Sequence, residues 1–334
     1  MNAAQLIDAL RARGFTAADV PAASGDDERP WYLSLLVGLA GWLAGVFVLV
    51  FIGIFLDLKS THDLLGIGLA LLVVAWLMYF FGGNRVFVDQ LALALSIAGQ
   101  IAITFYLFDT LKTACLIAIA ILCMQLVLFV AMPDRVARTL AAFFACVAWV
   151  FVVRFWLRPV TGVDVFFDPA GHTIAPRYGI WTLPLEWMIT WAPLMTAMTW
   201  LRRTEPRWMA RPGASYARPA ITGLLLGLAL AGVGAEPASL FEPGANTLGL
   251  PFDWWALFPL LSIALAMFAA WNAYLLRSDA LTGLAIVAAL LHLARFYYLY
   301  GTTLTIKSAI MLIVGGAFLA AAVVIERHGA KAAT

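Results

Sequence analysis

Ten long runs of apolar residues, joined by more polar connections, make up most of the chain. A helix that crosses a bilayer needs about 20 mostly apolar residues, and the runs are close to that length. Their polarity does not alternate, as it would in the strands of a membrane barrel. The pattern predicts an all-α integral membrane protein, a bundle of about ten transmembrane helices. The predicted spans are 31–56, 64–81, 86–108, 113–132, 139–157, 180–200, 219–235, 253–276, 280–299 and 303–325.

The two ends of the chain are more polar than these runs. Residues 1–30 are predicted to be a cytoplasmic segment, in which a short amphipathic helix with Leu6, Ile7 and Leu10 on one face precedes a polar linker. Its acidic residues and its lack of an apolar core argue against a signal peptide. The predicted transmembrane domain covers 31–326, and 327–334 form a short cytoplasmic tail.

The composition favours a membrane environment. Of the 334 residues, 63% are hydrophobic and 12% are charged, whereas a soluble domain is about 45–50% apolar and about 25% charged. A soluble fold of this size would have to expose a more polar surface than this chain can supply. Lipid is therefore expected to surround most of it.

The distribution of Lys and Arg predicts the orientation, because connections on the cytoplasmic side carry an excess of both. With both termini in the cytoplasm, fourteen basic residues lie inside and four outside. The inner set is Arg11, Arg13, Arg29, Arg85, Arg135, Arg138, Arg202, Arg203, Arg207, Arg211, Arg218, Arg277, Arg327 and Lys331. The outer set is Lys59, Lys112, Arg158 and Arg177. We therefore expect a multi-pass protein of the bacterial inner membrane, with a basic loop at 201–218 on the inner side.

Small and polar uncharged residues indicate how the predicted helices pack. Gly41 and Gly45 form one GxxxG motif and Gly223 and Gly227 form another. Such pairs allow two helices to approach closely. The amides of Gln100 and Gln125 are expected to bond across helices. Prolines at 184 and 193 are candidates for a break in the sixth span.

Six ionisable residues in or beside the spans are candidates for a functional site, because charges in a membrane are costly. In the predicted orientation they fall at a similar depth near the outer face, and basic groups outnumber acidic ones. If they meet, the site suits an anionic group such as a lipid phosphate or a carboxylate. This candidate polar pocket consists of Arg154, Glu186, Asp253, His292, Arg295 and Lys307.

Structural and catalytic roles for these six residues stay open as alternatives. Structural ion pairing accounts for Glu186 if it neutralises one arginine. Arg154 and Lys307 lie close enough to the interface for their side chains to reach the headgroups. Catalysis by His292 as a general base is the remaining alternative, and the sequence offers no second catalytic partner for it.

No established catalytic or metal-binding motif is present. The sequence lacks GxSxG, HExxH, a Walker loop and a dinucleotide fingerprint, so no catalytic residue and no cofactor are predicted. The four histidines are scattered, which argues against a metal site. Cysteines at 115, 123 and 146 lie in apolar runs without CxxC spacing, as buried hydrophobic residues do.

Three stretches resemble the DUF4401 family of bacterial multi-pass membrane proteins of unknown function. They begin at Pro30-Trp31, at Asp89-Gln90 and at Phe296-Tyr297. The features similar to that family are Gln90, Gly99, Gln100, Tyr297, Tyr298, Lys307 and Ser308. The resemblance implies a layout like that of DUF2157-type proteins and a small partner protein encoded nearby. It implies no activity.

The sequence leads to three functional hypotheses. The first is a non-enzymatic inner-membrane protein that binds an anionic lipid, glycan or envelope partner through the outer polar pocket. The second is a secondary transporter of a small anionic solute, built from two five-helix halves of opposite orientation. The third is a lipid-modifying enzyme. Membrane lipids and a small membrane or envelope protein are the expected partners, and nucleic acid is not.

Overall fold

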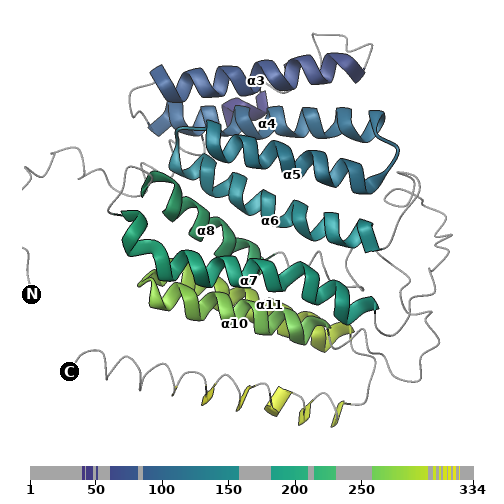
Figure 1. The fold of residues 1–334 in the computed structure, drawn as a ribbon, viewed down its shortest axis with the longest axis vertical. Coiled ribbons are helices and arrows are strands. Elements are labelled where there is room, and N and C mark those ends of the chain that lie inside the picture. Colours follow the sequence, from purple (N-terminus) through teal and green to yellow (C-terminus); the bar gives the residue numbers. More distant parts are fainter. Residues whose placement is uncertain are drawn as a thin grey trace, which may run out of the picture. The chain divides into compact units, whose positions relative to one another are not determined.

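A computed structural model describes residues 40–41, 43–47, 50–51, 61–81, 86–157, 182–209, 214–230 and 258–299, together with twelve positions between 304 and 323. Within these residues the regular elements are helices (Figure 1). They are α3 Thr61–Phe81, α4 Val86–Thr110, α5 Ala114–Ala131, α6 Arg135–Leu157, α7 Thr182–Met209, α8 Ala214–Leu230, α10 Phe258–Leu275 and α11 Asp279–Leu299. The predicted termini, 1–30 and 327–334, lie outside the described residues.

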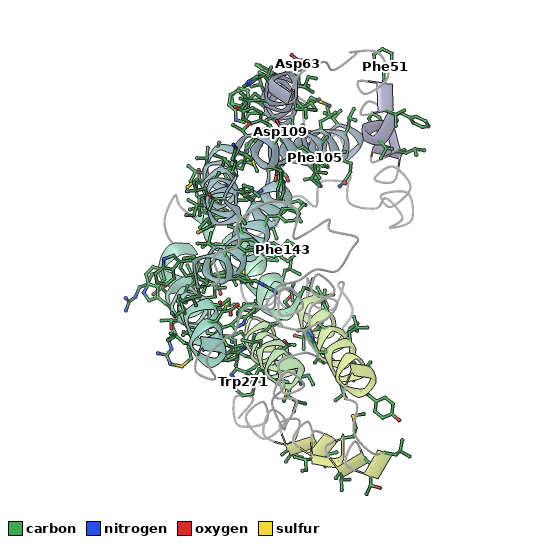
Figure 2. All side chains as sticks on the ribbon, turned by 90° about the vertical axis from the view of Figure 1, so that its right-hand side faces the viewer. Phe51, Asp63, Phe105, Asp109, Phe143 and Trp271 are labelled. Atoms are coloured by element: carbon green, nitrogen blue, oxygen red, sulfur yellow. The ribbon has the colours of Figure 1, made fainter. Side chains whose placement is uncertain are left out.

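The eight helices overlap the predicted spans between 64 and 299, and within the described residues the all-helical class is confirmed. Four segments are long and apolar enough to cross a membrane: His62–Phe81, Phe87–Thr110, Ala114–Ala131 and Arg135–Leu157. Large apolar side chains are exposed on the helices, including Phe51 and Phe105 (Figure 2). Extended apolar exposure of this kind is rare on soluble proteins, and it indicates association with a membrane.

The expected loop at 201–218 is wrong. Helix α7 continues to Met209 and α8 already starts at Ala214, so only 210–213 lie between these two helices. A helix can continue beyond the end of an apolar run, because arginine has a high helix propensity. Arg202, Arg203 and Arg207 are therefore helical residues of α7.

The sixth span is not broken at its candidate prolines, Pro184 and Pro193. Helix α7 runs through Pro193 and Pro206, and Pro184 lies in its first turn, where the missing backbone N–H would have no intrahelical acceptor. Proline inside a helix is tolerated in membrane proteins when neighbouring groups satisfy the freed carbonyl. A continuous helix thus carries Glu186 close to its start.

The described residues form two compact units, which divide α3 between Ala70 and Leu71 and α4 between Ala98 and Gly99. In the first unit, the helical segment around Gly41 and Gly45 packs on α4. A Cβ atom at Gly45 would lie 2.5 Å from the Cβ of Ala94. This contact confirms close helix packing at the first GxxxG motif.

In the second unit, α6 and α8 run parallel in close contact. The space for a Cβ at Gly223 is occupied by Ala142, the Thr139 carbonyl and the Phe143 amide, and the space at Gly227 by Cys146. The two contacts are one turn apart on α8 and one turn apart on α6, in the same order along the chain, so the helices are parallel. The second GxxxG motif is confirmed as a packing site.

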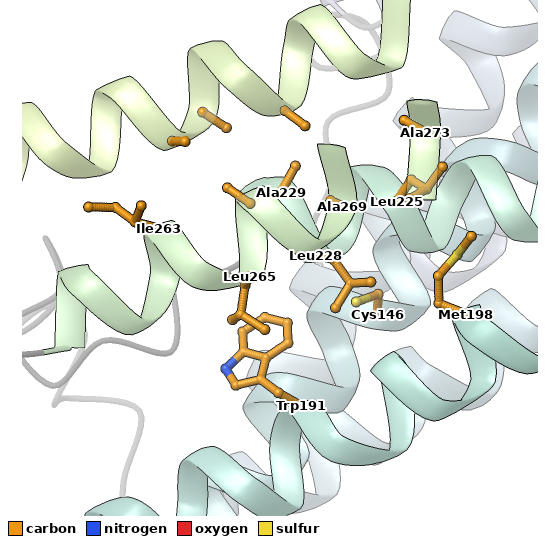
Figure 3. Close-up of a cluster of buried hydrophobic side chains, with 14 of the residues drawn as sticks. Cys146, Trp191, Met198, Leu225, Leu228, Ala229, Ile263, Leu265, Ala269 and Ala273 are labelled. Atoms are coloured by element: carbon orange, nitrogen blue, oxygen red, sulfur yellow. The ribbon is translucent and has the colours of Figure 1, made fainter. Parts of the chain in front are cut away.

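The largest apolar core of this unit joins α6, α7, α8, α10 and α11 (Figure 3). Large side chains from α7 and α8, among them Trp191 and Leu228, pack with small alanines from α10 and α11. Small residues let these helices approach without leaving cavities. The polar groups described below lie at the margins of this core.

A tight turn reverses the chain between α10 and α11. The Ser278 amide donates to the Ala273 carbonyl at 3.0 Å, and the Arg277 amide donates to the Tyr274 carbonyl at 2.9 Å. These two bonds are those of a Schellman helix end. Arg277 occupies the left-handed position, with φ 56°, which glycine normally fills.

Gly223→Ala should destabilise the protein by about 1–3 kcal/mol, because the added methyl group meets the backbone of α6 and overpacks the contact. Thermal unfolding in detergent micelles measures the effect. Gly283→Ala is the matched control, since a Cβ there meets open space, and it should leave the unfolding temperature unchanged or raised. Equal losses in both variants would contradict the packing.

Arg277→Gly should stabilise the α10–α11 hairpin by up to about 1 kcal/mol, because it removes the cost of a left-handed L-residue. Arg277→Ala retains that cost and should give no gain. The same unfolding measurement distinguishes the variants. A gain of equal size in Arg277→Ala would show that loss of the arginine charge, and not backbone conformation, is responsible.

Candidate functional site

Five polar side chains are buried at one end of the second unit, where α6, α8 and α11 finish and α7 and α10 start. Each is at most 5% exposed. We refer to this set as the polar layer. It consists of Arg154 from α6, Glu186 and Thr190 from α7, Ser262 from α10 and His292 from α11.

A hydrogen bond between α6 and α7 fixes their register. The indole Nε1 of Trp149 donates to the Thr190 carbonyl at 3.0 Å. Glu186 lies one turn before Thr190 on the same face of α7. Arg154 lies a little more than one turn beyond Trp149 on α6. Because the helices are antiparallel, Arg154 and Glu186 reach nearly the same level.

Arg154 and Trp149 nevertheless point to different sides of α6. Five residues correspond to a rotation of about 140° around an α-helix. Val153, one turn after Trp149, lies on the same face of α6 as Trp149, whereas Arg154 does not. The geometry therefore places Arg154 and Glu186 in one layer without making them direct neighbours on facing helix surfaces.

His292 is 2% exposed, and its Nε2 lies 3.3 Å from the Ala229 carbonyl oxygen. A carbonyl can only accept, so the ring nitrogen must carry the proton in this bond. Ala229 belongs to the last turn of α8 as described, where carbonyls lack intrahelical donors. The imidazole therefore links α11 to the end of α8.

Three of the six predicted pocket residues, Arg154, Glu186 and His292, are buried towards the same end of the second unit. Arg295 lies in α11, about one turn beyond His292, but its side chain is outside the described residues. Asp253 and Lys307 also lie outside the described residues. Sequence patterns missed Thr190 and Ser262, because a hydroxyl in an apolar run gives no signal until the facing helix is known.

A second polar cluster lies at the opposite end of the same helices. The Arg138 guanidinium lies 4.0 Å from the centre of the Tyr216 ring, and its Nε donates to the Met132 carbonyl at 2.6 Å. Arg218 forms a salt bridge with Glu205. These contacts join the α5–α6 turn, the end of α7 and the start of α8.

The two glutamine side chains bond as predicted. Gln125 on α5 donates through Nε2 to Oε1 of Gln100 on α4 at 2.8 Å, within the second unit. Gln125 is almost fully buried. The bond ties two apolar helices together.

The other family-like residues are scattered. Gln90 lies beneath Gly41 in the first unit, and the carbonyl of Gly99 lies next to Gly68 in the second. Tyr297 is partly buried and Ser308 is exposed. The side chains of Tyr298 and Lys307 are outside the described residues, so no common site is defined for this group.

The cysteines only partly match their predicted environment. Cys146 is buried against Gly227, whereas Cys115 is partly exposed and Cys123 is exposed. An apolar run does not distinguish a helix face that packs from one that faces outward. Within the described residues, no group of three or more His, Cys, Asp or Glu side chains could hold a metal ion.

Comparison with known families identifies the relatives of this chain. A family model described as Domain of unknown function (DUF4401) matches residues 30–250, more than half of the chain. The chain belongs to the DUF4401 family. The DUF4401-like stretches at Pro30 and Asp89 lie within the match, and the stretch at Phe296 lies beyond it. Comparison with curated proteins gives no match, and comparison with solved structures gives none either.

Replacing Gln125 with leucine should destabilise the protein by about 0.5–2 kcal/mol, because the amide bond to Gln100 is lost. Gln100→Leu should cost a similar amount. The double variant should cost less than the sum, with a coupling energy of about 0.5 kcal/mol or more. Unfolding in detergent micelles measures all three, and strictly additive losses would contradict the bond.

Proposed function

We propose that this protein is a multi-pass protein of the bacterial inner membrane, with ten spans and both termini in the cytoplasm. The distribution of basic residues supports this orientation. Helix α7 supports it further, because its exposed stripe changes from Trp200 to Arg203 and Arg207 within two turns. Tryptophan followed by arginine is typical of a membrane–water boundary.

In this orientation the polar layer lies towards the outer face, and we propose that it binds an anionic group. The observation that supports the proposal is that Arg154, Glu186 and His292, from three different helices, are buried towards the same end of the bundle. By the predicted spans, Arg295 and Lys307 flank the same outer connection. With Arg154 they outnumber the acidic groups, Glu186 and Asp253.

An excess of cations in a region of low dielectric favours a bound anion, because charge-assisted hydrogen bonds to guanidinium are strong there. Glu186 would moderate this attraction while the site is empty. A phospholipid phosphate is the anion in greatest supply at that depth. A glycan or a small envelope protein that presents an acidic group would use the same chemistry. Since the sequence holds no catalytic motif, we propose a non-enzymatic role.

Arg154→Gln should reduce the amount of anionic phospholipid retained by the purified protein about tenfold, because a buried charge-assisted contact is worth roughly 1.5–3 kcal/mol. Native mass spectrometry after exposure to phosphatidylglycerol measures the bound lipid. Phosphatidylcholine, which has no net charge, should bind weakly to both proteins.

Arg138→Gln is the matched control, since Arg138 is a buried arginine of the same helix at the opposite end. It should retain phosphatidylglycerol at the wild-type level. Equal loss in the two variants, or no loss in Arg154→Gln, would contradict the proposed site. Proteins that remain bound through purification from native membranes, identified by mass spectrometry, would reveal an envelope partner.

A further inference from the structure

One side of α7 is exposed along most of its length. The exposed residues follow one another at intervals of three or four positions, so they form a single stripe on the helix. Trp200 is 53% exposed, and it separates an apolar part of the stripe from two arginines. The one hydroxyl in the apolar part donates to its own helix, to the Ala192 carbonyl at 2.7 Å. The exposed stripe consists of Leu185, Met188, Ala192, Thr196, Trp200, Arg203 and Arg207.

The two arginines lie close to the end of the apolar part of the stripe. Helix α7 continues through both of them to Met209, so no connection carries them away from this face. At 1.5 Å of rise per residue, Arg203 lies about 4.5 Å and Arg207 about 10 Å beyond Trp200 along the axis. The headgroup region of a leaflet is about 5–8 Å thick. Long arginine side chains at these two levels reach lipid phosphates.

The charge of these arginines is not neutralised by α7 itself. Its two acidic residues lie off the exposed stripe and are buried, Glu186 with 5% and Glu205 with 9% exposure. Glu205 is paired with Arg218 of α8. Within the described residues, no acidic side chain forms a salt bridge with Arg203 or Arg207. The end of the stripe therefore presents two positive charges outward.

We propose that Arg203 and Arg207 bind the phosphates of anionic phospholipids in the cytoplasmic leaflet, with Trp200 beside them at the edge of the hydrocarbon region. Anionic lipid is preferred because it keeps a net negative charge next to the arginines, and each basic group near such lipid is worth about a fivefold preference. This surface lies at the end of α7 remote from the polar layer. The choice of leaflet rests on the proposed orientation, whereas the contact itself does not.

An exposed contact of this kind exchanges with the surrounding lipid, so the test is made in a bilayer and not after purification in detergent. Full-length protein is placed in nanodiscs of phosphatidylcholine and phosphatidylglycerol, with bromine on the acyl chains of one lipid at a time. Bromine quenches tryptophan fluorescence on contact. Because the chain has 13 tryptophans, the signal of Trp200 is the difference between each protein and the same protein carrying Trp200→Phe.

Per mole of brominated lipid, phosphatidylglycerol should quench Trp200 about fivefold more strongly than phosphatidylcholine at low salt. The double variant Arg203→Gln, Arg207→Gln should bring this ratio close to one. The double variant with lysine at both positions should retain most of the preference, because the charges remain. High salt should lower the wild-type ratio, since exposed charges are screened.

Arg277→Gln is the matched control. Arg277 is also an exposed arginine at this end of the second unit, but it belongs to the α10–α11 turn and not to the stripe. Its replacement should leave the quenching ratio at Trp200 unchanged.

A wild-type ratio near one would overturn the proposal, and it is the result expected if the arginines bind an acidic segment of a partner protein instead. A ratio that the double glutamine variant leaves unchanged would also overturn it. The proposed function fails differently. If phosphatidylglycerol retention in detergent is insensitive to Arg154→Gln while the quenching ratio still depends on Arg203 and Arg207, the lipid surface stands and the anion site in the polar layer does not.

Discussion

Polar groups within this bundle have to find their partners inside the protein. The surrounding helices are apolar, and an unsatisfied donor in such surroundings costs several kcal/mol. The structure meets this constraint largely with backbone carbonyls. Trp149 donates to Thr190, His292 bonds Ala229 and Arg138 donates to Met132. Two of these acceptors, Ala229 and Met132, lie at helix ends, where carbonyls lack intrahelical donors, whereas Thr190 lies inside α7.

Close helix packing makes these bonds geometrically possible. Glycines at 223 and 227 bring α8 against α6, and the facing alanines of α10 and α11 bring those two helices together. The apolar core between the two ends thus sets the register in which the polar layer forms.

The sequence was sufficient to predict the helices, both GxxxG contacts and the Gln100–Gln125 bond, because each follows from the periodicity or chemistry of a short segment. Arg154, Glu186 and His292 were recognised because a charge or an imidazole in an apolar run is conspicuous. Thr190 and Ser262 were not, since their roles depend on which helix faces them. The loop predicted at 201–218 is wrong because a segment that loses its apolar residues can remain helical. The direction in which Arg138 and Arg154 point from α6 depends on how the helices pack, and a short stretch of sequence does not determine it.

The most direct test of the account is the side of the membrane on which the polar layer lies. In a variant without Cys115, Cys123 and Cys146, a single cysteine replaces Ser278 in the α10–α11 turn, at the end of the hairpin remote from Ser262 and His292. A membrane-impermeant maleimide added to intact cells should not label this cysteine, and labelling should appear after permeabilisation. Labelling in intact cells would place the polar layer on the cytoplasmic side and contradict the account.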